Sequence, residues 1–161
     1  MKKKIILSVL CFACAILCNA RTGAVVLLDE GFVSDSDSLF TPAQEQELNA
    51  LITGFKAKTD NEIAVITVNS CAPYSNMNDF SRDLSNNWQL WNGGEAQNSL
   101  LIIVSRSLHT VRITTAYGTE KLIQNDVCRR IIDTQMLPAY AADNYFAGTK
   151  QGLLALIKAW Q

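Results

Sequence analysis

The sequence predicts an α/β fold: a Rossmann-like, three-layer α/β/α sandwich around a small mixed sheet whose last two strands form an antiparallel hairpin. Two buried β-branched runs, each preceded by an amphipathic helical segment, indicate strands joined by helical crossovers. A third strand follows the second after a connection of hairpin length. The chain has 161 residues, enough for one compact domain.

Residues 1–20 have the pattern of a secretory signal peptide. Three lysines open the segment, an apolar run from Ile5 to Leu17 follows, and small residues end it. The run is shorter than the roughly 20 residues that span a bilayer, which argues against a retained anchor. A lipoprotein attached through Cys14 is the alternative, but the residues before that cysteine fit a lipobox poorly. We therefore expect an exported protein, periplasmic or secreted, with no membrane span after cleavage.

The charge of the chain argues against one class of partner. The formal net charge is −1, and removal of residues 1–20 takes away three lysines and no acidic residue. The remaining chain is acidic, so it has no basic excess with which to displace counterions from nucleic acid. An exported acidic domain meets divalent cations at high concentration, which makes carboxylate clusters candidate metal sites.

The domain is predicted to begin after a lead-in segment over 21–32, in which Val25–Leu28 can dock as an edge strand. Residues 33–161 form the domain. Thr41, followed by Pro42 and by Gln44 at the third helical position, predicts a capping box at the start of the first helix.

The remaining elements are predicted from periodicity and caps. Consecutive apolar positions mark strands that are buried on both faces, and apolar residues at three- and four-residue steps mark helices. Asn125 and Asn144 are the predicted caps of the last two helices. The predicted elements are, in order, a helix over 42–58, a strand over 62–68, a helix over 77–91, strands over 99–104 and 109–115, and helices over 125–138 and 144–160.

This topology predicts which loops meet. If the two central strands are parallel, the Gly93–Asn98 loop, the Tyr117-Gly118 turn and Glu120 gather at one rim with the start of the third helix. Cys128 belongs to this rim, whereas Cys71 lies at the far end of a strand of roughly 20 Å. A disulfide needs Cα atoms within about 7 Å, so we predict none.

Several kinds of catalysis lack support in the sequence. One histidine, His109, would have to serve any serine or cysteine nucleophile, and no Gly-x-Ser-x-Gly elbow is present. One histidine and two distant cysteines offer no zinc spacing, and neither a P-loop nor a dinucleotide-binding glycine motif occurs. Asp35-Ser36-Asp37-Ser38 matches neither the nucleophile loop of aspartate-dependent phosphatases nor an EF-hand loop, because Gly31-Phe32-Val33 is too brief a strand and later ligands are missing.

Spatial convergence gives a candidate metal site. The predicted rim gathers carboxylate and amide oxygens, a mixture that suits Ca²⁺ or Mg²⁺. The alternative is that Glu120 interacts with a helix dipole and that Asp133 is an exposed helical carboxylate. The candidate ligands are Asp35, Gln97, Asn98, Glu120 and Asp133.

The chain resembles the TPM-domain family, which includes thylakoid-lumen proteins of photosystem II repair and many exported bacterial proteins. The resemblance covers about 33–160. It is carried by Val33-x-Asp35 before the Thr-Pro helix start, by Trp88 and the loop to Asn98, and by four further segments. These segments are the buried strand over 99–104, Val111-Arg112-Ile113, Tyr117-Gly118-Thr119-Glu120, and Ile131-Ile132-Asp133 with Leu137-Pro138, Tyr145 and Gly148.

The resemblance implies an α/β/α sandwich outside the cytoplasm, divalent-cation binding near the Asp-Asn loop, and phosphatase activity in some members. Gln97 replaces the aspartate of that loop, and Ser99, Ala116 and Asn144 also depart from the family pattern. Loss of a negative charge at Gln97 should weaken cation binding or abolish it.

Three functional hypotheses follow. In the first, the domain binds a divalent cation weakly and serves as an interaction or assembly module, as a monomer, with an envelope protein or complex as partner. In the second, it is an acid-phosphatase-like phosphomonoesterase in which a cation polarises phosphate, Asp35 or Glu120 orients water, and Arg112 is the cationic clamp. In the third, it is a structural interaction domain without a ligand.

Overall fold

The computed structural model describes residues 31–91 and 98–161, and it has the predicted α/β fold. The predicted signal peptide and the predicted strand over 25–28 lie outside these residues. A sheet in the order β1-β2-β3-β4 is covered by helices on both faces. Its elements are β1 (Val33–Asp35), α1 (Pro42–Thr59), β2 (Glu62–Thr67), α2 (Met77–Trp91), β3 (Ser99–Ser105), β4 (Thr110–Thr115), α3 (Tyr117–Glu120), α4 (Asn125–Ile131), the π-helix η1 (Ile132–Met136), α5 (Leu137–Ala141) and α6 (Tyr145–Ala159).

The sheet confirms the predicted mixed topology and adds one strand. β2 and β3 are parallel, with Glu62 opposite Ser99, and β3 and β4 form the antiparallel hairpin. The segment whose pattern is too brief to predict a strand is in fact β1, shifted toward Asp35 and parallel to β2. Three residues give too short a pattern to identify a strand from periodicity, but pairing with β2 is enough to order them.

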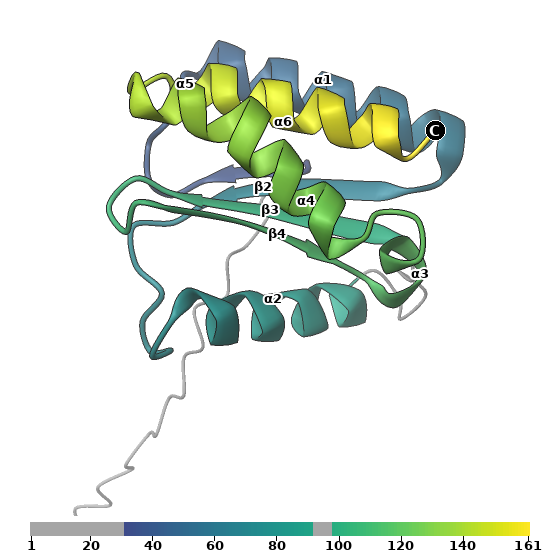
Figure 1. Cartoon of the computed structure of the whole chain (residues 1–161), viewed down its shortest axis with the longest axis horizontal. Coiled ribbons are helices and arrows are strands. Elements are labelled where there is room, and N and C mark those ends of the chain that lie inside the picture. The colour runs from purple at the N-terminus through teal and green to yellow at the C-terminus, as the bar shows by residue number, and fades with distance from the viewer. Residues whose placement is uncertain (1–30, 92–97) are drawn as a thin grey trace, which may run out of the picture.

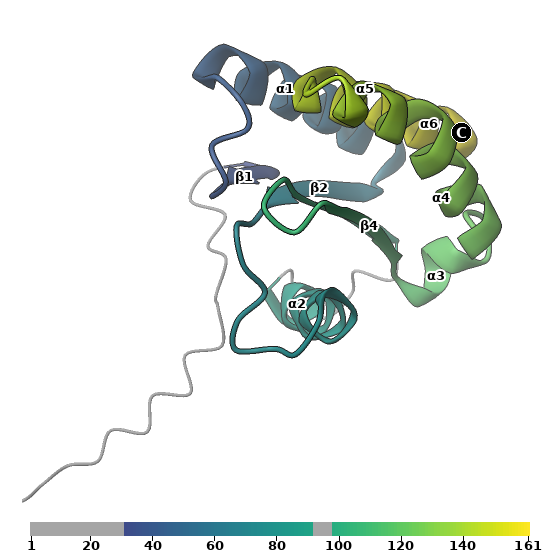
Figure 2. The ribbon, with the colours of Figure 1, turned by 60° about the vertical axis from the view of Figure 1, so that its left-hand side comes forward.

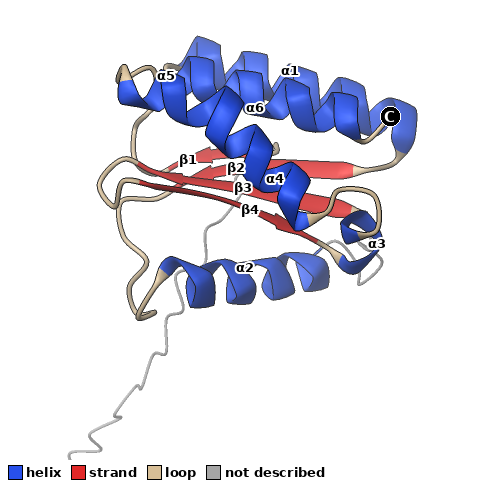
Figure 3. Ribbon diagram, viewed as in Figure 1, coloured by secondary structure: helices blue, strands red, loops and turns tan. Residues whose placement is uncertain are grey.

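The two faces of the sheet have separate cores. Ile63 and Val65 pack with α1, α4 and α6, while Ala64 and Ile66 pack with α2. Figures 1 and 3 show α2 below the sheet and α1, α4, α5 and α6 above it. The helices α1 and α2 therefore connect successive parallel strands on opposite faces while the strand order advances in one direction. The two crossovers consequently have opposite hands, and only one follows the right-handed rule.

The first helix begins as the sequence predicts. The hydroxyl of Thr41 accepts a hydrogen bond from the Gln44 N–H at 3.3 Å, and the Gln44 side chain accepts one from the Thr41 N–H at 2.9 Å. The reciprocal pair confirms the capping box. Leu48, Ile52 and Phe55 form the buried stripe of α1.

The predicted helix over 125–138 is instead α4, η1 and α5 in succession, and it continues past Pro138 to Ala141. Asn125 is its first helical residue rather than its cap, which is Gln124. The Leu137 N–H donates to the Ile132 carbonyl, the five-residue step of a π-helix. Pro138, which has no N–H, lies in the first turn of α5, directly after the π-helix has replaced the regular four-residue hydrogen bonding.

Helix α6 packs closely on this composite helix through two glycines. Asn144 caps α6 as predicted, with its side chain accepting from the Ala147 N–H at 3.1 Å. A Cβ atom on Gly148 would lie 2.5 Å from the ring of Tyr140 and 2.8 Å from the carbonyl oxygen of Met136. Gly152 faces the Met136 side chain in the same way. The helices can approach this closely only because both positions lack a side chain.

Within residues 31–91 and 98–161, four residues other than glycine have left-handed backbone conformations, and each ends or connects regular elements. They are Ser38 (φ 52°), Asp60 (φ 58°), His109 (φ 48°) and Asp143 (φ 56°). Asp60 caps the C-terminus of α1, and His109 closes the β3–β4 turn rather than opening the strand as predicted.

The structure also bears on the two cysteines of the domain and on whether its helices could cross a membrane. Cys71 and Cys128 are both free thiols. Among the helices of the described residues, none combines the length and apolarity that a membrane crossing needs.

Candidate functional site

The carboxyl ends of β1 and β2 carry a compact polar cluster centred on Asp35. The Asp35 carboxylate accepts hydrogen bonds from the N–H groups of Leu39 (3.0 Å) and Phe40 (2.7 Å) and from the Thr67 hydroxyl. Thr67 is fully buried at the end of β2. The carboxylate therefore orders the loop that leads into α1.

Asp37 extends this cluster to the β3–β4 hairpin. Its own N–H donates to the Thr67 hydroxyl oxygen at 2.9 Å, and its carboxylate accepts from the Arg106 N–H at 2.9 Å. The Arg106 side chain lies over the ring of Tyr145, 5.9 Å from its centroid. Strands β1 and β2 and the β3–β4 hairpin turn are thus joined at one edge.

This edge is also the topological switch point of the sheet. The chain leaves β1 toward the face of α1 and leaves β2 toward the face of α2, so the two connections diverge beside Asp35 and Thr67 (Figure 2). Open α/β sheets bind ligands at such points. Here the diverging loops are bridged by the protein's own hydrogen bonds.

Glu45 adds a second carboxyl group near Asp35. Burial raises its pKa above the ordinary value of 4.5, and the charge of Asp35 raises it further. The side chain is half-buried in the first turn of α1. The folded protein therefore favours the neutral form of Glu45 more than the unfolded chain does.

The predicted rim exists at the opposite edge of the sheet. The Glu62 N–H donates to the Asn98 carbonyl at 2.9 Å, and the Ala116 N–H donates to the Ser99 carbonyl at 2.9 Å. Asn98 and α3 are consequently neighbours, and Glu120 is the last residue of α3. Both Asn98 and Glu120 are exposed.

The structure does not bring all the predicted metal ligands to this rim. Asp35 pairs with Thr67, five residues along β2 from Glu62, which places it about 17 Å from the rim edge. The expected convergence was wrong for Asp35 because β1 is a strand parallel to β2, so its end belongs to the carboxyl edge.

The other two predicted ligands do not complete a set. Asp133 is exposed in η1, beyond the seven residues of α4. Gln97 lies outside the described residues. Within the described parts of the chain, no three His, Cys, Asp or Glu side chains are placed to hold a metal ion. The rim thus offers Asn98 and Glu120 as oxygen donors, and the five-residue set does not fit one ion.

Arg112 occupies a third location. It lies on β4 and alternates with Ile113, which packs in the core on the α1 face, so Arg112 faces α2. Asp35 follows the parity of Val33 and faces α1. Three strand spacings, about 14 Å, separate the two strands. Asp35, Glu120 and Arg112 therefore lie at separate places in the fold.

The rim also carries two exposed side chains that the sequence did not predict as functional candidates. Tyr117 is 71% exposed and Leu122 is 67% exposed, on either side of Glu120. The Lys121 ammonium lies 4.6 Å from the centroid of the Tyr117 ring. Their signal in the sequence is weak, because an apolar residue in a turn looks the same whether it is buried or exposed.

These features define a four-stranded α/β/α domain with two polar sheet edges. The chain belongs to the TPM domain family, whose model matches residues 33–159. The resemblance that the sequence motifs indicated is thereby confirmed. The comparison with curated proteins found no match.

Solved structures agree on the fold. The chain is similar to the N-terminal domain of a protein from P. gingivalis, with 29% identity, a TM-score of 0.72 and coverage of 80% of each chain. The BA42 protein from Bizionia argentinensis has 19% identity and a TM-score of 0.64, covering 76% of this chain and 86% of its own. The N-terminal domain of the cg2496 protein from Corynebacterium glutamicum has 13% identity and a TM-score of 0.61, with coverage of 82% and 81%. The last two likenesses concern the fold alone.

Proposed function

We propose that this TPM domain is an exported binding module that docks an envelope protein at the rim formed by Asn98 and α3. The observation that carries the proposal is the exposure of Tyr117 (71%) and Leu122 (67%) around the carboxylate of Glu120. Large apolar side chains beside polar groups are typical of protein interfaces.

A divalent cation has a subordinate role in this proposal. Asn98 and Glu120 supply two oxygen donors, whereas Ca²⁺ takes six to eight. Such a pair holds Ca²⁺ or Mg²⁺ weakly by itself and leaves positions for a partner's oxygens. The cation would then strengthen docking rather than fold the domain.

The cation is tested by thermal melting of the purified protein with millimolar Ca²⁺, Mg²⁺ or chelator. A ligand of the native state raises stability by mass action. We expect a small rise that Glu120→Ala removes and that Asp133→Ala leaves in place. Equal melting temperatures of the wild type under all three conditions would exclude a role for the cation.

Docking is tested with a photo-crosslinking amino acid at Tyr117 in cells that produce the protein. We expect one discrete adduct that is lost when Leu122→Ser is added. The control places the same group at Leu154, which is 42% exposed on α6. Absence of an adduct at Tyr117, or the same adduct from Leu154, would overturn the docking site.

The phosphatase hypothesis, which the name of the family model also carries, has less support from the geometry. Asp35 is engaged in three hydrogen bonds at one edge of the sheet, and Glu120 lies at the other. Arg112 faces α2. A metal-assisted hydrolysis needs these groups within reach of one phosphate.

A further inference from the structure

The outer edge of β4 is an unpaired strand edge. The sheet ends at β4, and its register with β3 runs without a bulge from Thr110 to Thr115. The Ala116 N–H donates to the Ser99 residue directly opposite, so alternate peptide groups point toward β3. Those of Val111, Ile113 and Thr115 therefore point away from it. No described residue hydrogen-bonds to these outward groups.

This edge lacks three of the usual protections against strand pairing, namely proline, a bulge and short length, and its one charged residue is Arg112. Its sequence is Thr-Val-Arg-Ile-Thr-Thr, which contains no proline and no lysine. The other edge of the sheet is β1, which is blunted by its length of only three residues. Long, regular edges without such devices are templates for another strand.

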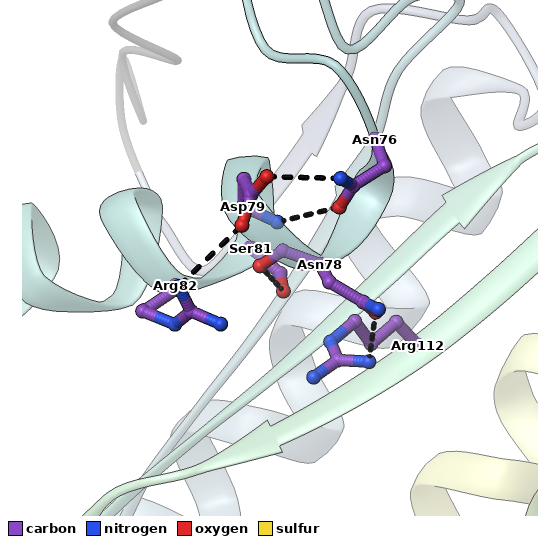
Figure 4. Close-up of polar contacts among 6 residues, drawn as sticks. All are labelled: Asn76, Asn78, Asp79, Ser81, Arg82 and Arg112. Carbon is purple, nitrogen blue, oxygen red and sulfur yellow. Dashed lines mark hydrogen bonds and ion pairs between the residues drawn. The ribbon is translucent and has the colours of Figure 1, made fainter.

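Arg112 in the middle of this edge has a charge without a counterion. Its Nη1 donates to the amide oxygen of Asn78 at 2.5 Å, while its Nε is buried and has no partner. Figure 4 shows the nearby carboxylate of Asp79 turned instead toward Asn76 and Arg82. In the described parts of the chain, no carboxylate pairs with Arg112. A partly buried guanidinium held only by a neutral amide favours an anionic partner.

We propose that the outer edge of β4 binds an acidic, extended segment of a partner protein by strand addition, with a carboxylate of that segment paired to Arg112. The outward groups of Val111, Ile113 and Thr115 would form the backbone ladder. In an antiparallel addition, the residue opposite Arg112 belongs to a non-hydrogen-bonded pair. Such pairs have Cα atoms about 4.5 Å apart, the closest side-chain approach in a sheet.

The charge around the edge selects an acidic segment over a second copy of this chain. Arg106 of the adjoining hairpin turn lies over the Tyr145 ring, and its N–H donates to Asp37, so among the described residues the positive charge without a counterion at this edge is that of Arg112. A second β4 strand would bring another Arg112 to the same face, and like charges across a strand pair are unfavourable. The surface differs from the Asn98 and α3 rim, so this inference does not depend on the proposed function.

The test is an NMR titration of the purified protein with a short synthetic peptide that alternates threonine and valine around one central glutamate. We expect shift changes and slowed amide exchange at Val111, Ile113 and Thr115. Replacement of the glutamate by glutamine, or Arg112→Gln in the protein, should weaken binding about tenfold, the effect of one charge-assisted hydrogen bond. Arg112→Glu should restore binding to a lysine-centred peptide.

Three controls keep the test decisive. Arg82→Gln changes an exposed arginine that is paired with Asp79, and it should bind the peptide like the wild type. A peptide N-methylated on the groups that face β4 should not bind, a result that does not rely on any protein variant folding. Chelator and Glu120→Ala should leave peptide binding unchanged.

Other outcomes would overturn the inference. Equal binding of glutamate and glutamine peptides would remove the role of Arg112. Shifts produced by inorganic phosphate at Arg112, without any change in the β4 amides, would indicate an anion site and not strand addition. Concentration-dependent broadening of β4 without peptide would indicate that a second copy occupies the edge.

Discussion

Replacing Gly148 with alanine tests whether the close approach of α6 and η1 is required for stability. The new Cβ atom would lie 2.8 Å from the Met136 carbonyl oxygen, a backbone atom that cannot rotate away. It would also lie 2.5 Å from the Tyr140 ring, whose hydroxyl is hydrogen-bonded to Thr149 at 2.9 Å. Either the two helices separate or the ring leaves its place.

The magnitude follows from two opposing effects. Overpacking of a core costs about 1–3 kcal/mol, whereas alanine is favoured over glycine within a helix by up to about 1 kcal/mol. Gly54 provides a matched control, because it lies in α1 and a Cβ atom added there would meet no other atom within 4 Å. Gly54→Ala should therefore be stabilised by the higher helix propensity of alanine and should suffer no overpacking. The two variants should therefore differ by about 1–3 kcal/mol, with Gly148→Ala the less stable.

The assay is urea denaturation of both variants and the wild type, followed by circular dichroism. Gly54→Ala should be slightly more stable than the wild type, and Gly148→Ala less stable. In thermal melting, each kcal/mol corresponds to about 4 °C for a domain of this size. Gly148→Ala with stability equal to or above that of Gly54→Ala would show that the helices can separate without cost, which refutes the close-packing explanation.

Three further predictions concern polar and thiol groups. Glu45→Gln should raise the stability of the folded protein at pH 7, because burial and the charge of Asp35 raise the pKa of Glu45 in the folded state. The gain should disappear below about pH 4, where Glu45 is protonated in both the folded and the unfolded chain. Thermal melting of both proteins across this pH range is the measurement. Burial, and then the charge of Asp126, raises the pKa of Cys128 to about 11, so a thiol reagent at pH 8 should label Cys71 first and Cys128 only after unfolding. Thr67→Val should lower the free energy of unfolding, measured by urea denaturation, by about 1–3 kcal/mol, because it leaves the Asp35 carboxylate without its hydroxyl donor. An unchanged free energy of unfolding would contradict the role of this hydrogen bond.

Local patterns in the sequence were sufficient to predict most elements of the fold. The capping box at Thr41 and the apolar stripe of α1 depend on neighbours a few residues apart, as does the hairpin connection between β3 and β4. Such features are determined by helical and strand geometry and need no knowledge of the rest of the chain.

The features that were missed depend on contacts distant in sequence. β1 is defined by its pairing with β2 and not by its own three residues. The π-helix ends at Met136, whose side chain packs against Gly152 and whose carbonyl oxygen lies close to Gly148, so its surroundings are set by another helix.

The candidate site likewise has a part that the sequence predicted and a part that depends on distant contacts. The rim of Asn98 and Glu120 was predicted correctly, because hairpin return and parallel pairing place them at one edge. Asp35 was placed wrongly because its position depends on β1. The exposure of Tyr117 and the missing counterion of Arg112 are properties of surfaces, which periodicity does not report.

The left-handed residues at the ends of the elements mark positions where a change of residue is expected to raise the stability of this domain. Left-handed backbone costs a residue with a side chain about 1–2 kcal/mol, and glycine avoids most of that cost. His109 and Ser38 both have this conformation. Selection removes sequences that fall below a working threshold and is indifferent above it. Replacing Ser38 or His109 with glycine is therefore expected to stabilise the domain. The added stability could compensate for destabilising substitutions made elsewhere to test the function of the protein.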